Sequence, residues 1–317
     1  MQARFANRQG WLALGLAGLM LVSGMARADA ALQWLNRAVS AAKQQNYSGV
    51  YVYQHGEQVE VLRVLHRAGP AGELEKIEVL DGTPRKFLRV NSDVYCHLSD
   101  GKQVRLERNA LRRFFPSLLP AQPASLLDYY DAKLGGTERV AGRPCQVVTL
   151  VPRDGYRFSY NLWLDKQTGL PLKSRVVNSS GGVVSMFVFS EIQIGKSPDA
   201  RLFRNDLAGK QVEASFDRPV EIAWDVTPPP GFERVQEAVR SLPGKQEPVT
   251  HLVFSDGLSV LSMFVEPVDP QLQNLRGLSA EGVIGIYARE VDGHTVTTLG
   301  EVPNMALIET GNSVKRK

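Results

Sequence analysis

Residues 145–194 of this 317-residue chain read CQVVTLVPRDGYRFSYNLWLDKQTGLPLKSRVVNSSGGVVSMFVFSEIQI, and the pattern indicates four consecutive β-strands. Apolar and polar side chains alternate in the second strand, which is the period of a strand with one face buried. One face carries Tyr156, Phe158, Tyr160, Leu162 and Leu164, and the other carries Arg157, Ser159, Asn161, Trp163 and Asp165. Turns of the Asp-Gly and Gly-Gly type separate the strands, because glycine adopts the positive φ that tight hairpins require. The stretch therefore predicts an antiparallel meander with one apolar, aromatic face.

Short predicted strands also precede this meander, at close intervals. They follow a helix whose apolar stripe runs from Ala31 to Ala42, and the strands after the segment 107–134 resume at Arg139–Val151. The earlier strands are expected at Val50–Tyr53, Val59–His66, Leu74–Leu80, Lys86–Val90, Val94–Leu98 and Gln103–Leu106. This spacing predicts a mainly β fold with helices (α+β), built on one large antiparallel sheet that is closed or half closed.

The first residues have the features of a secretory signal peptide. Arg4 and Arg8 precede an apolar run from Trp11 to Met25, and Ala26-Arg27-Ala28 forms an A-x-A cleavage site. We expect residues 1–28 to be removed, although an uncleaved anchor remains the alternative. These residues hold three arginines and no acid, so the remainder has 34 basic and 33 acidic residues. With a net charge of +1, the composition gives no support for nucleic-acid binding.

Two cysteines, Cys96 and Cys145, lie within predicted strands. In an oxidising compartment they can form one disulfide, provided that strand pairing brings their Cα atoms within about 7 Å. Two buried thiols are the alternative. No pair of histidines or cysteines has the spacing of metal ligands, so no metal and no cofactor is expected.

The segment 107–134 interrupts the strand pattern, because Pro116, Pro120 and Pro123 prevent a continuous ladder. It is rich in apolar side chains and carries a group of arginines. The residues singled out are Phe114, Phe115, Leu118 and Leu119, with Arg108, Arg112 and Arg113 beside them. Two interpretations remain open: the segment is a lid over a cavity for apolar ligands, or its apolar side chains simply plug the sheet as core.

The polar stretch after residue 195 marks a change of domain. We expect a large domain over 29–204, a linker over 205–220 and a small α+β domain over 221–317, with hairpins turning at Asp256-Gly257 and Asp292-Gly293. A weak helix is expected over 303–312. The five histidines are scattered and none lies in a catalytic motif, so the chain is predicted not to be an enzyme.

Several phrases resemble known families. LWLDKQTGLPLKS (162–174) is similar to a strand–turn–strand signature of the lipoprotein carriers LolA and LolB. VPRDGYRFSYNLWLD (151–165), VLDGTPRK (79–86) and FSDGLSVLSMFVEP (254–267) resemble the RseB/MucB family of periplasmic regulators of sigma-E activity, as do WDVTPPPGF (224–232) and TTLGEVP (297–303). The likeness covers nearly the whole exported chain. A second domain is absent from the carriers, which favours RseB/MucB.

This resemblance implies an unclosed β-barrel with helices across its opening, followed by a smaller α+β domain. It implies that the protein binds the periplasmic part of a transmembrane anti-sigma factor (RseA/MucA-like) and protects it from regulated proteolysis. It also implies that lipopolysaccharide or another lipid relieves this protection. The alternatives are a periplasmic carrier of lipoproteins or lipids and a hydrolase of unknown substrate; a homo-oligomer is also left open. The tail from Pro303 onward is poor in helix-forming pattern, so the last helix is expected to be short or poorly ordered.

A lipid can be bound by the predicted elements in a simple way. Each methylene that enters a dry cavity gains roughly 0.8 kcal/mol, and guanidinium groups hold phosphates by charge-assisted hydrogen bonds. We therefore take Arg108, Arg112 and Arg113, which border the apolar segment, as candidates for binding lipid phosphate. The alternative is that these arginines are solvated surface charges.

Overall fold

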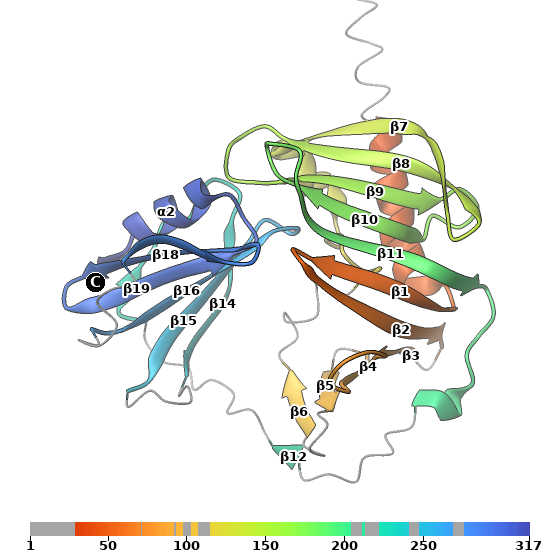
Figure 1. Ribbon diagram of the computed structural model, residues 1–317, viewed down its shortest axis with the longest axis horizontal. Coiled ribbons are helices and arrows are strands. Elements are labelled where there is room, and N and C mark those ends of the chain that lie inside the picture. Colours follow the sequence, from red (N-terminus) through yellow and green to blue (C-terminus); the bar gives the residue numbers. More distant parts are fainter. Residues whose placement is uncertain are drawn as a thin grey trace, which may run out of the picture.

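The computed structural model describes residues 29–70, 72–91, 93–97, 103–106, 115–203, 211–212, 222–240, 247–268 and 276–317. Within these residues the chain forms a twelve-stranded sheet and a six-stranded sheet, which lie side by side (Figure 1), and a separate two-stranded pairing. None of the helices in these ranges is long and apolar enough to cross a lipid bilayer.

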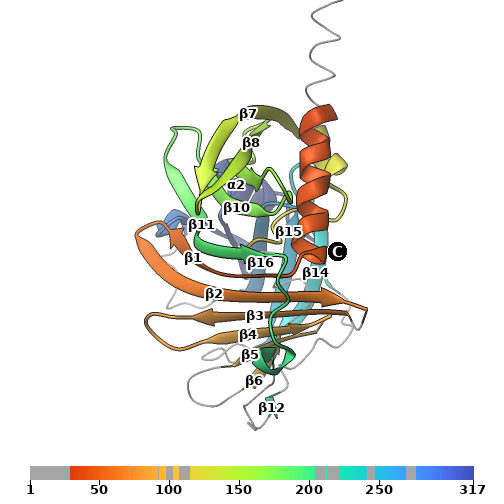
Figure 2. The same ribbon diagram turned by 90° about the vertical axis from the view of Figure 1, so that its right-hand side faces the viewer.

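The large sheet is antiparallel except at one edge, where β12 runs parallel to β6. Its order is β12-β6-β5-β4-β3-β2-β1-β11-β10-β9-β8-β7. The strands are β1 (Tyr47–His55), β2 (Gln58–Gly69), β3 (Gly72–Val79), β4 (Lys86–Val90), β5 (Asp93–His97), β6 (Gln103–Leu106), β7 (Tyr130–Val140), β8 (Arg143–Pro152), β9 (Ser159–Asp165), β10 (Pro171–Val177), β11 (Val183–Ile194) and β12 (Gln211–Val212). The predicted four-stranded meander is confirmed as β8 to β11. The whole sheet is curved, and its edges are not joined (Figure 2).

The edge strand β7 of the large sheet was not predicted. β7 starts at Tyr130, whereas the sequence pattern placed the resumption of strands at Arg139. Residues between its two ends are mostly exposed and include Gly135-Gly136, so β7 lacks the alternation that reveals a half-buried strand. It pairs only with β8, through a bulge between Leu134 and Thr137, as the edge strand of the sheet.

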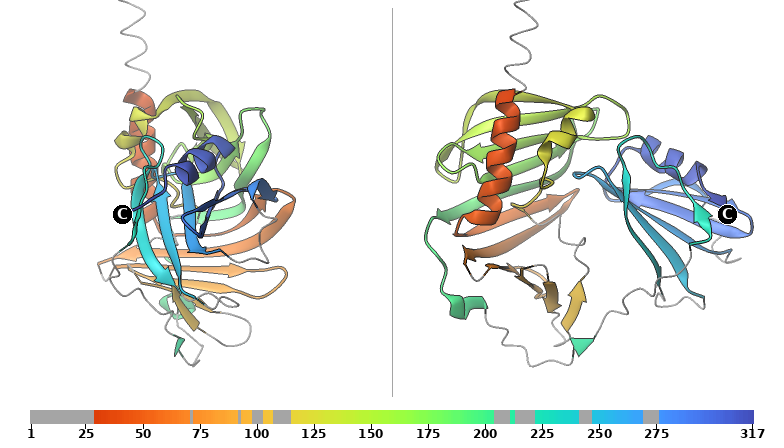
Figure 3. Two further views of the ribbon diagram at one scale, coloured as in Figure 1. Left: turned by 90° about the vertical axis from the view of Figure 1, so that its left-hand side faces the viewer. Right: turned by 180° about the vertical axis from the view of Figure 1, so that it is seen from behind.

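The predicted N-terminal helix is confirmed over residues 29–44. It runs along one side of the curved sheet (Figure 3), and Ala31, Leu35 and Ala38 are fully buried. These side chains join Leu162 and Leu164 of β9 in one apolar cluster. The N-terminal helix therefore packs on part of the apolar face of the meander.

The polar face of β9 is more buried than the sequence indicated. Trp163 is 4% exposed, because Lys173 lies over its ring at 4.4 Å, and its Nε1–H donates to Glu138 at 2.7 Å. Asp165 has no exposed surface. Its carboxylate accepts hydrogen bonds from Arg143 Nε at 2.8 Å and from the Thr168 backbone N–H at 2.9 Å.

These bonds hold the turn between β9 and β10 against the N-terminal helix. Gly169, in this turn, has a φ of +86°, and a Cβ at this position would lie 3.1 Å from the Arg37 carbonyl oxygen of the helix. Burial raises the pKa of Asp165, but the bonds from Arg143 and Thr168 outweigh it and hold that pKa below its usual value. The D-x-x-T-G phrase thus has a structural explanation.

The second domain packs a helix on a six-stranded antiparallel sheet of order β14-β15-β16-β19-β18-β17. Its elements are β13 (Trp224–Asp225), β14 (Glu233–Arg240), β15 (Val249–Ser255), β16 (Val260–Pro267), β17 (Gly277–Glu281), β18 (Ile284–Val291), β19 (His294–Gly300), α2 (Asn304–Asn312) and β20 (Lys315–Arg316). Both predicted hairpins are present, and β17 was missed. The tail is short but structured, because β20 pairs with β13 after α2.

Most of the predicted linker 205–220 lies outside the described residues. The part that is described, β12, pairs with β6 at Gln211↔Gln103 and Val212↔Val104. Before it lies the short 3-10 helix Ala200–Phe203. The predicted domain boundaries stay predictions.

Candidate functional site

A cavity of about 270 Å³ lies where the two domains meet. Most of its wall is apolar and comes from the large sheet. The aromatic residues of this wall are Tyr51, Tyr53, Phe87, Tyr160 and Phe187; the aliphatic ones are Leu62, Val79, Leu118, Val176, Leu258 and Val260. The cavity is therefore suited to a hydrocarbon rather than to a polar metabolite.

The polar wall residues are few, and most are already hydrogen-bonded. Arg85 forms an ion pair with Glu60. Glu301 of the second domain accepts from Ser185 at 3.2 Å and lies 2.8 Å from Nε2 of His55. The described wall thus contains two carboxylates and one arginine, and each carboxylate has a basic partner.

The turn between β15 and β16 closes one side of the cavity. It brings Leu258, Ser259 and Val260 from the second domain to the cavity wall. Leu258 also packs against the apolar cluster of the first domain that contains Leu126 and Tyr130. Gly257, at φ +95°, lies so close that a Cβ there would be 3.2 Å from the Pro120 side chain. The cavity wall is therefore complete only when the two domains are in this arrangement.

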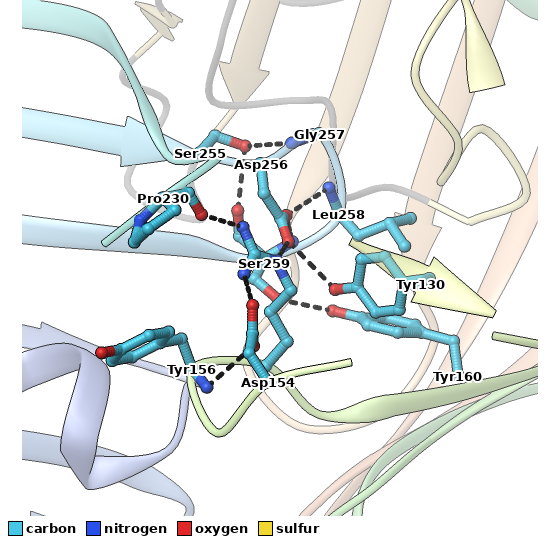
Figure 4. A network of polar contacts seen from close by, with 11 residues as sticks. Tyr130, Asp154, Tyr156, Tyr160, Pro230, Ser255, Asp256, Gly257, Leu258 and Ser259 are labelled. Carbon is cyan, nitrogen blue, oxygen red and sulfur yellow. Dashed lines mark hydrogen bonds and ion pairs between the residues drawn. The ribbon is translucent and has the colours of Figure 1, made fainter. Parts of the chain in front are cut away.

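Arg157 fixes this turn from the first domain, and its three partners Asp154, Pro230 and Asp256 are labelled in Figure 4. Its Nε donates to Asp256 at 2.7 Å, its Nη2 donates to the Pro230 carbonyl at 2.6 Å, and its Nη1 donates to Asp154. The guanidinium also lies over the ring of Tyr129 at 4.5 Å, a cation–π contact.

Asp256 is held equally firmly. Its second oxygen accepts from the backbone N–H groups of Leu258 and Ser259, at 2.9 and 2.7 Å, which shapes the turn. Tyr130 donates its hydroxyl to the oxygen that Arg157 binds, at 3.0 Å. Burial and the neighbouring Tyr160 and Asp256 raise the pKa of Tyr130, so this hydroxyl stays a donor at every physiological pH.

The structure places the predicted site residues as follows. Arg108, Arg112, Arg113 and Phe114 lie outside the described residues. Phe115 is fully buried against Tyr51, Phe187 and Phe189, so it belongs to the core. Leu118 lines the cavity, and Leu119 packs against the cluster under the helix. In the described part of the segment, Phe115 thus belongs to the core and Leu118 to the cavity wall, and the choice between the lid and plug interpretations stays open.

Cys96 and Cys145 are both buried free thiols, so the disulfide alternative is not formed. They lie on β5 and β8, which are separated by β4, β3, β2, β1, β11, β10 and β9 in the order of the sheet. Burial raises the pKa of the Cys145 thiol to about 11. Within the described ranges, no three side chains of histidine, cysteine, aspartate or glutamate are grouped as metal ligands.

Sequence reasoning missed the residues of the second domain that complete the site. Asp256 was assigned only to a hairpin turn, Leu258 to the strand after it, and Arg157 to the polar face of a strand. The signal that was present is a charged residue next to aromatics in each phrase, RDGYRF and FSDGL.

Comparison with known proteins gives two family matches that together span the chain from residue 30 to residue 315. Residues 30–214 match the MucB/RseB N-terminal domain and residues 219–315 match the MucB/RseB C-terminal domain. The sigma factor AlgU regulatory protein MucB of Pseudomonas aeruginosa is 33% identical over 304 residues, which are 92% of each chain. The sigma-E factor regulatory protein RseB of Escherichia coli K12 is 26% identical over 316 residues, covering 97% of this chain and 98% of that one.

The solved structure of the Pseudomonas aeruginosa MucA/MucB complex is similar across both domains. Its matching chain has a TM-score of 0.74 at 30% identity and covers 90% of this chain and 99% of that one. This coverage takes in both the large sheet and the second domain. The likeness read from the sequence phrases is confirmed: this chain belongs to the MucB/RseB family of sigma factor regulatory proteins.

Proposed function

We propose that this protein is a periplasmic negative regulator of an envelope-stress sigma factor of the sigma-E type. In this role it binds the periplasmic part of a transmembrane anti-sigma factor and protects that segment from regulated proteolysis. The observation that carries the proposal is the two-domain match to MucB, which has been solved in a complex with MucA. The predicted signal peptide, residues 1–28, supports a location in the periplasm.

The interdomain cavity is the proposed site at which a lipid relieves this protection. Burial of each methylene of a ligand against the apolar wall contributes roughly 0.8 kcal/mol to the free energy of binding. Because both domains contribute to the wall, a ligand that occupies it senses how the domains are arranged. A ligand and a partner that prefer different arrangements weaken each other's binding by the same factor.

Arg108, Arg112 and Arg113 are the proposed ligands for lipid phosphate. They precede Leu118 in the chain, and Leu118 lines the cavity. Replacing Arg112 and Arg113 together by glutamate is expected to weaken the release of the partner by lipopolysaccharide. Unchanged release would remove these two arginines from the site.

The proposal is tested with the chain that begins at Asp29 and the periplasmic segment of a MucA-like anti-sigma factor from the same genome. We expect binding in a pull-down, and slower cleavage of that segment by its site-specific protease when the protein is present. Absence of binding, together with transfer of lipoproteins to a membrane acceptor, would favour the alternative of a periplasmic carrier.

A further inference from the structure

The turn Asp256–Val260 lies in the wall of the interdomain cavity, where its position decides whether a hydrocarbon ligand can enter. Leu258 packs in the apolar cluster of the first domain and lines the cavity at the same time. It is a side chain of the second domain placed in the hydrocarbon environment of the first. A ligand chain entering this space has to replace it.

The size of the cavity also indicates that a ligand and the turn compete for the same space. Ordinary ligand pockets measure roughly 300–1,000 Å³, and the cavity, at about 270 Å³, lies below this range. A lipid with several acyl chains therefore needs more room than the arrangement provides. The turn is the element that can give this room without opening the large sheet, because it belongs to the other domain.

The turn is held by contacts that act together. Arg157 and Asp256 are both buried, with side chains 0% and 1% exposed, and Tyr130 donates to the same carboxylate. Tyr160 and Ser259 are hydrogen-bonded at 3.2 Å across the same boundary. Gly231 fits closely against Arg157 and Tyr129, since a Cβ there would lie 2.6 Å from Arg157 Nη2. If the turn moves, the contacts of Asp256 with Arg157 and Tyr130 and the contact of Ser259 with Tyr160 are lost together.

We propose that the β15–β16 turn competes with hydrocarbon for the interdomain cavity. Leu258 fills space that an acyl chain would take, and the Arg157–Asp256 ion pair holds the turn in place. We call the turn in this position the plug. This rests on the proposed function and adds its regulation: the plugged arrangement binds the anti-sigma factor, and the ligand-filled one does not. The likeness to MucB taken from its complex with MucA supports the first half of that assignment.

Two variants test the plug with dansyl-undecanoic acid as the probe. Leu258→Ala shortens the side chain that fills this space. A plug predicts that the probe then binds about fivefold more tightly, because less apolar contact opposes its entry. If Leu258 is only part of the cavity wall, the substitution should instead weaken probe binding, because the probe loses a contact. Leu278→Ala, at an exposed leucine of the same domain, is the matched control and is expected to change nothing.

The second variant links the β15–β16 turn to the first domain by a disulfide, so that the turn cannot move away. Cysteines at positions 120 and 257 (Pro120→Cys with Gly257→Cys) place two Cβ atoms about 3.2 Å apart, close to the ~3.5–4.5 Å of a disulfide. The reduced form of the same protein is the control, since it carries the same substitutions. We expect the oxidised form to bind the probe at least about tenfold more weakly, because the open state is no longer accessible, and to bind the anti-sigma segment as well as the reduced form.

Equal probe binding by the oxidised and reduced forms, or weaker or unchanged binding by Leu258→Ala, would overturn the plug while leaving the proposed function intact. Failure of every form, wild type included, to bind the probe would overturn the lipid site of the proposed function and the plug with it. Failure to bind the anti-sigma segment, with the probe results as expected, would contradict the proposed function and the regulation assigned to it, while competition between the turn and hydrocarbon would still stand.

Discussion

The guanidinium of Arg157 and the carboxylate of Asp256 meet at 2.7 Å between the two domains, with side chains 0% and 1% exposed. A buried ion pair is not a strong source of stability in itself, because both groups lose their hydration. Removing one partner is costly, since it leaves the other charge buried and unpaired. The pair therefore makes this arrangement of the domains specific rather than more stable.

Arg157→Met is expected to lower the stability of the interdomain contact by about 3 kcal/mol, the usual cost of leaving one buried charge unpaired. The measurement is the urea concentration at which the two domains separate, and small-angle scattering monitors that separation. Arg153→Met is the matched control. Arg153 forms a pair of similar length with Asp131, at 2.9 Å, but both side chains are 52% exposed, so its effect should stay below about 1 kcal/mol. Equal effects of the two substitutions would contradict the role of the buried pair.

Gly231→Ala is expected to loosen the same contact. Gly231 has a φ of +81°, and a Cβ there would lie 2.4 Å from the Tyr129 ring. Gly293→Ala is the control for backbone strain, because Gly293 has a φ of +72° and no atom within 4 Å of the added Cβ. Strain alone costs about 1–2 kcal/mol. If both variants lower the unfolding midpoint equally and neither changes the scattering profile, the contact at Gly231 has no influence on the domain arrangement.

Asp165→Asn should make stability less sensitive to acid. The pKa of Asp165 is lowered in the fold, so the unfolded chain binds its proton more readily. The stabilisation is complete above the ordinary pKa of about 4 and is lost as the pH falls through the lowered folded value. Wild type should therefore lose more stability than Asp165→Asn between pH 5 and 3, roughly, in urea titrations. Parallel curves for the two proteins would show that Asp165 does not contribute to the acid sensitivity.

The thiols should be unreactive in the native protein. Cys96 and Cys145 are buried, and burial raises the pKa of both. Ellman's reagent near pH 8 is expected to label neither in the folded protein and both after unfolding without reductant. Failure to label either cysteine after unfolding would mean that the two are joined in a disulfide.

The meander β8 to β11 was predictable because its signals are local: alternation along each strand and glycine at each turn. The N-terminal helix was predictable for the same reason. The Arg157–Asp256 pair was not, because its partners are 99 residues apart and each has an ordinary local role. Trp163 and Asp165 were assigned to a solvated face, and only tertiary partners such as Lys173 and Arg143 bury them. β7 escaped prediction because an exposed edge strand with two glycines has no hydrophobic period.

The most direct test of the account is a calorimetric titration of the chain from Asp29 with the periplasmic segment of its anti-sigma factor, with and without lipopolysaccharide. We expect binding in the absence of lipopolysaccharide and an affinity reduced at least about tenfold in its presence, which corresponds to a coupling of about 1.4 kcal/mol between the two sites. An affinity for the segment that is the same with and without lipopolysaccharide, or no binding in either case, would contradict the account.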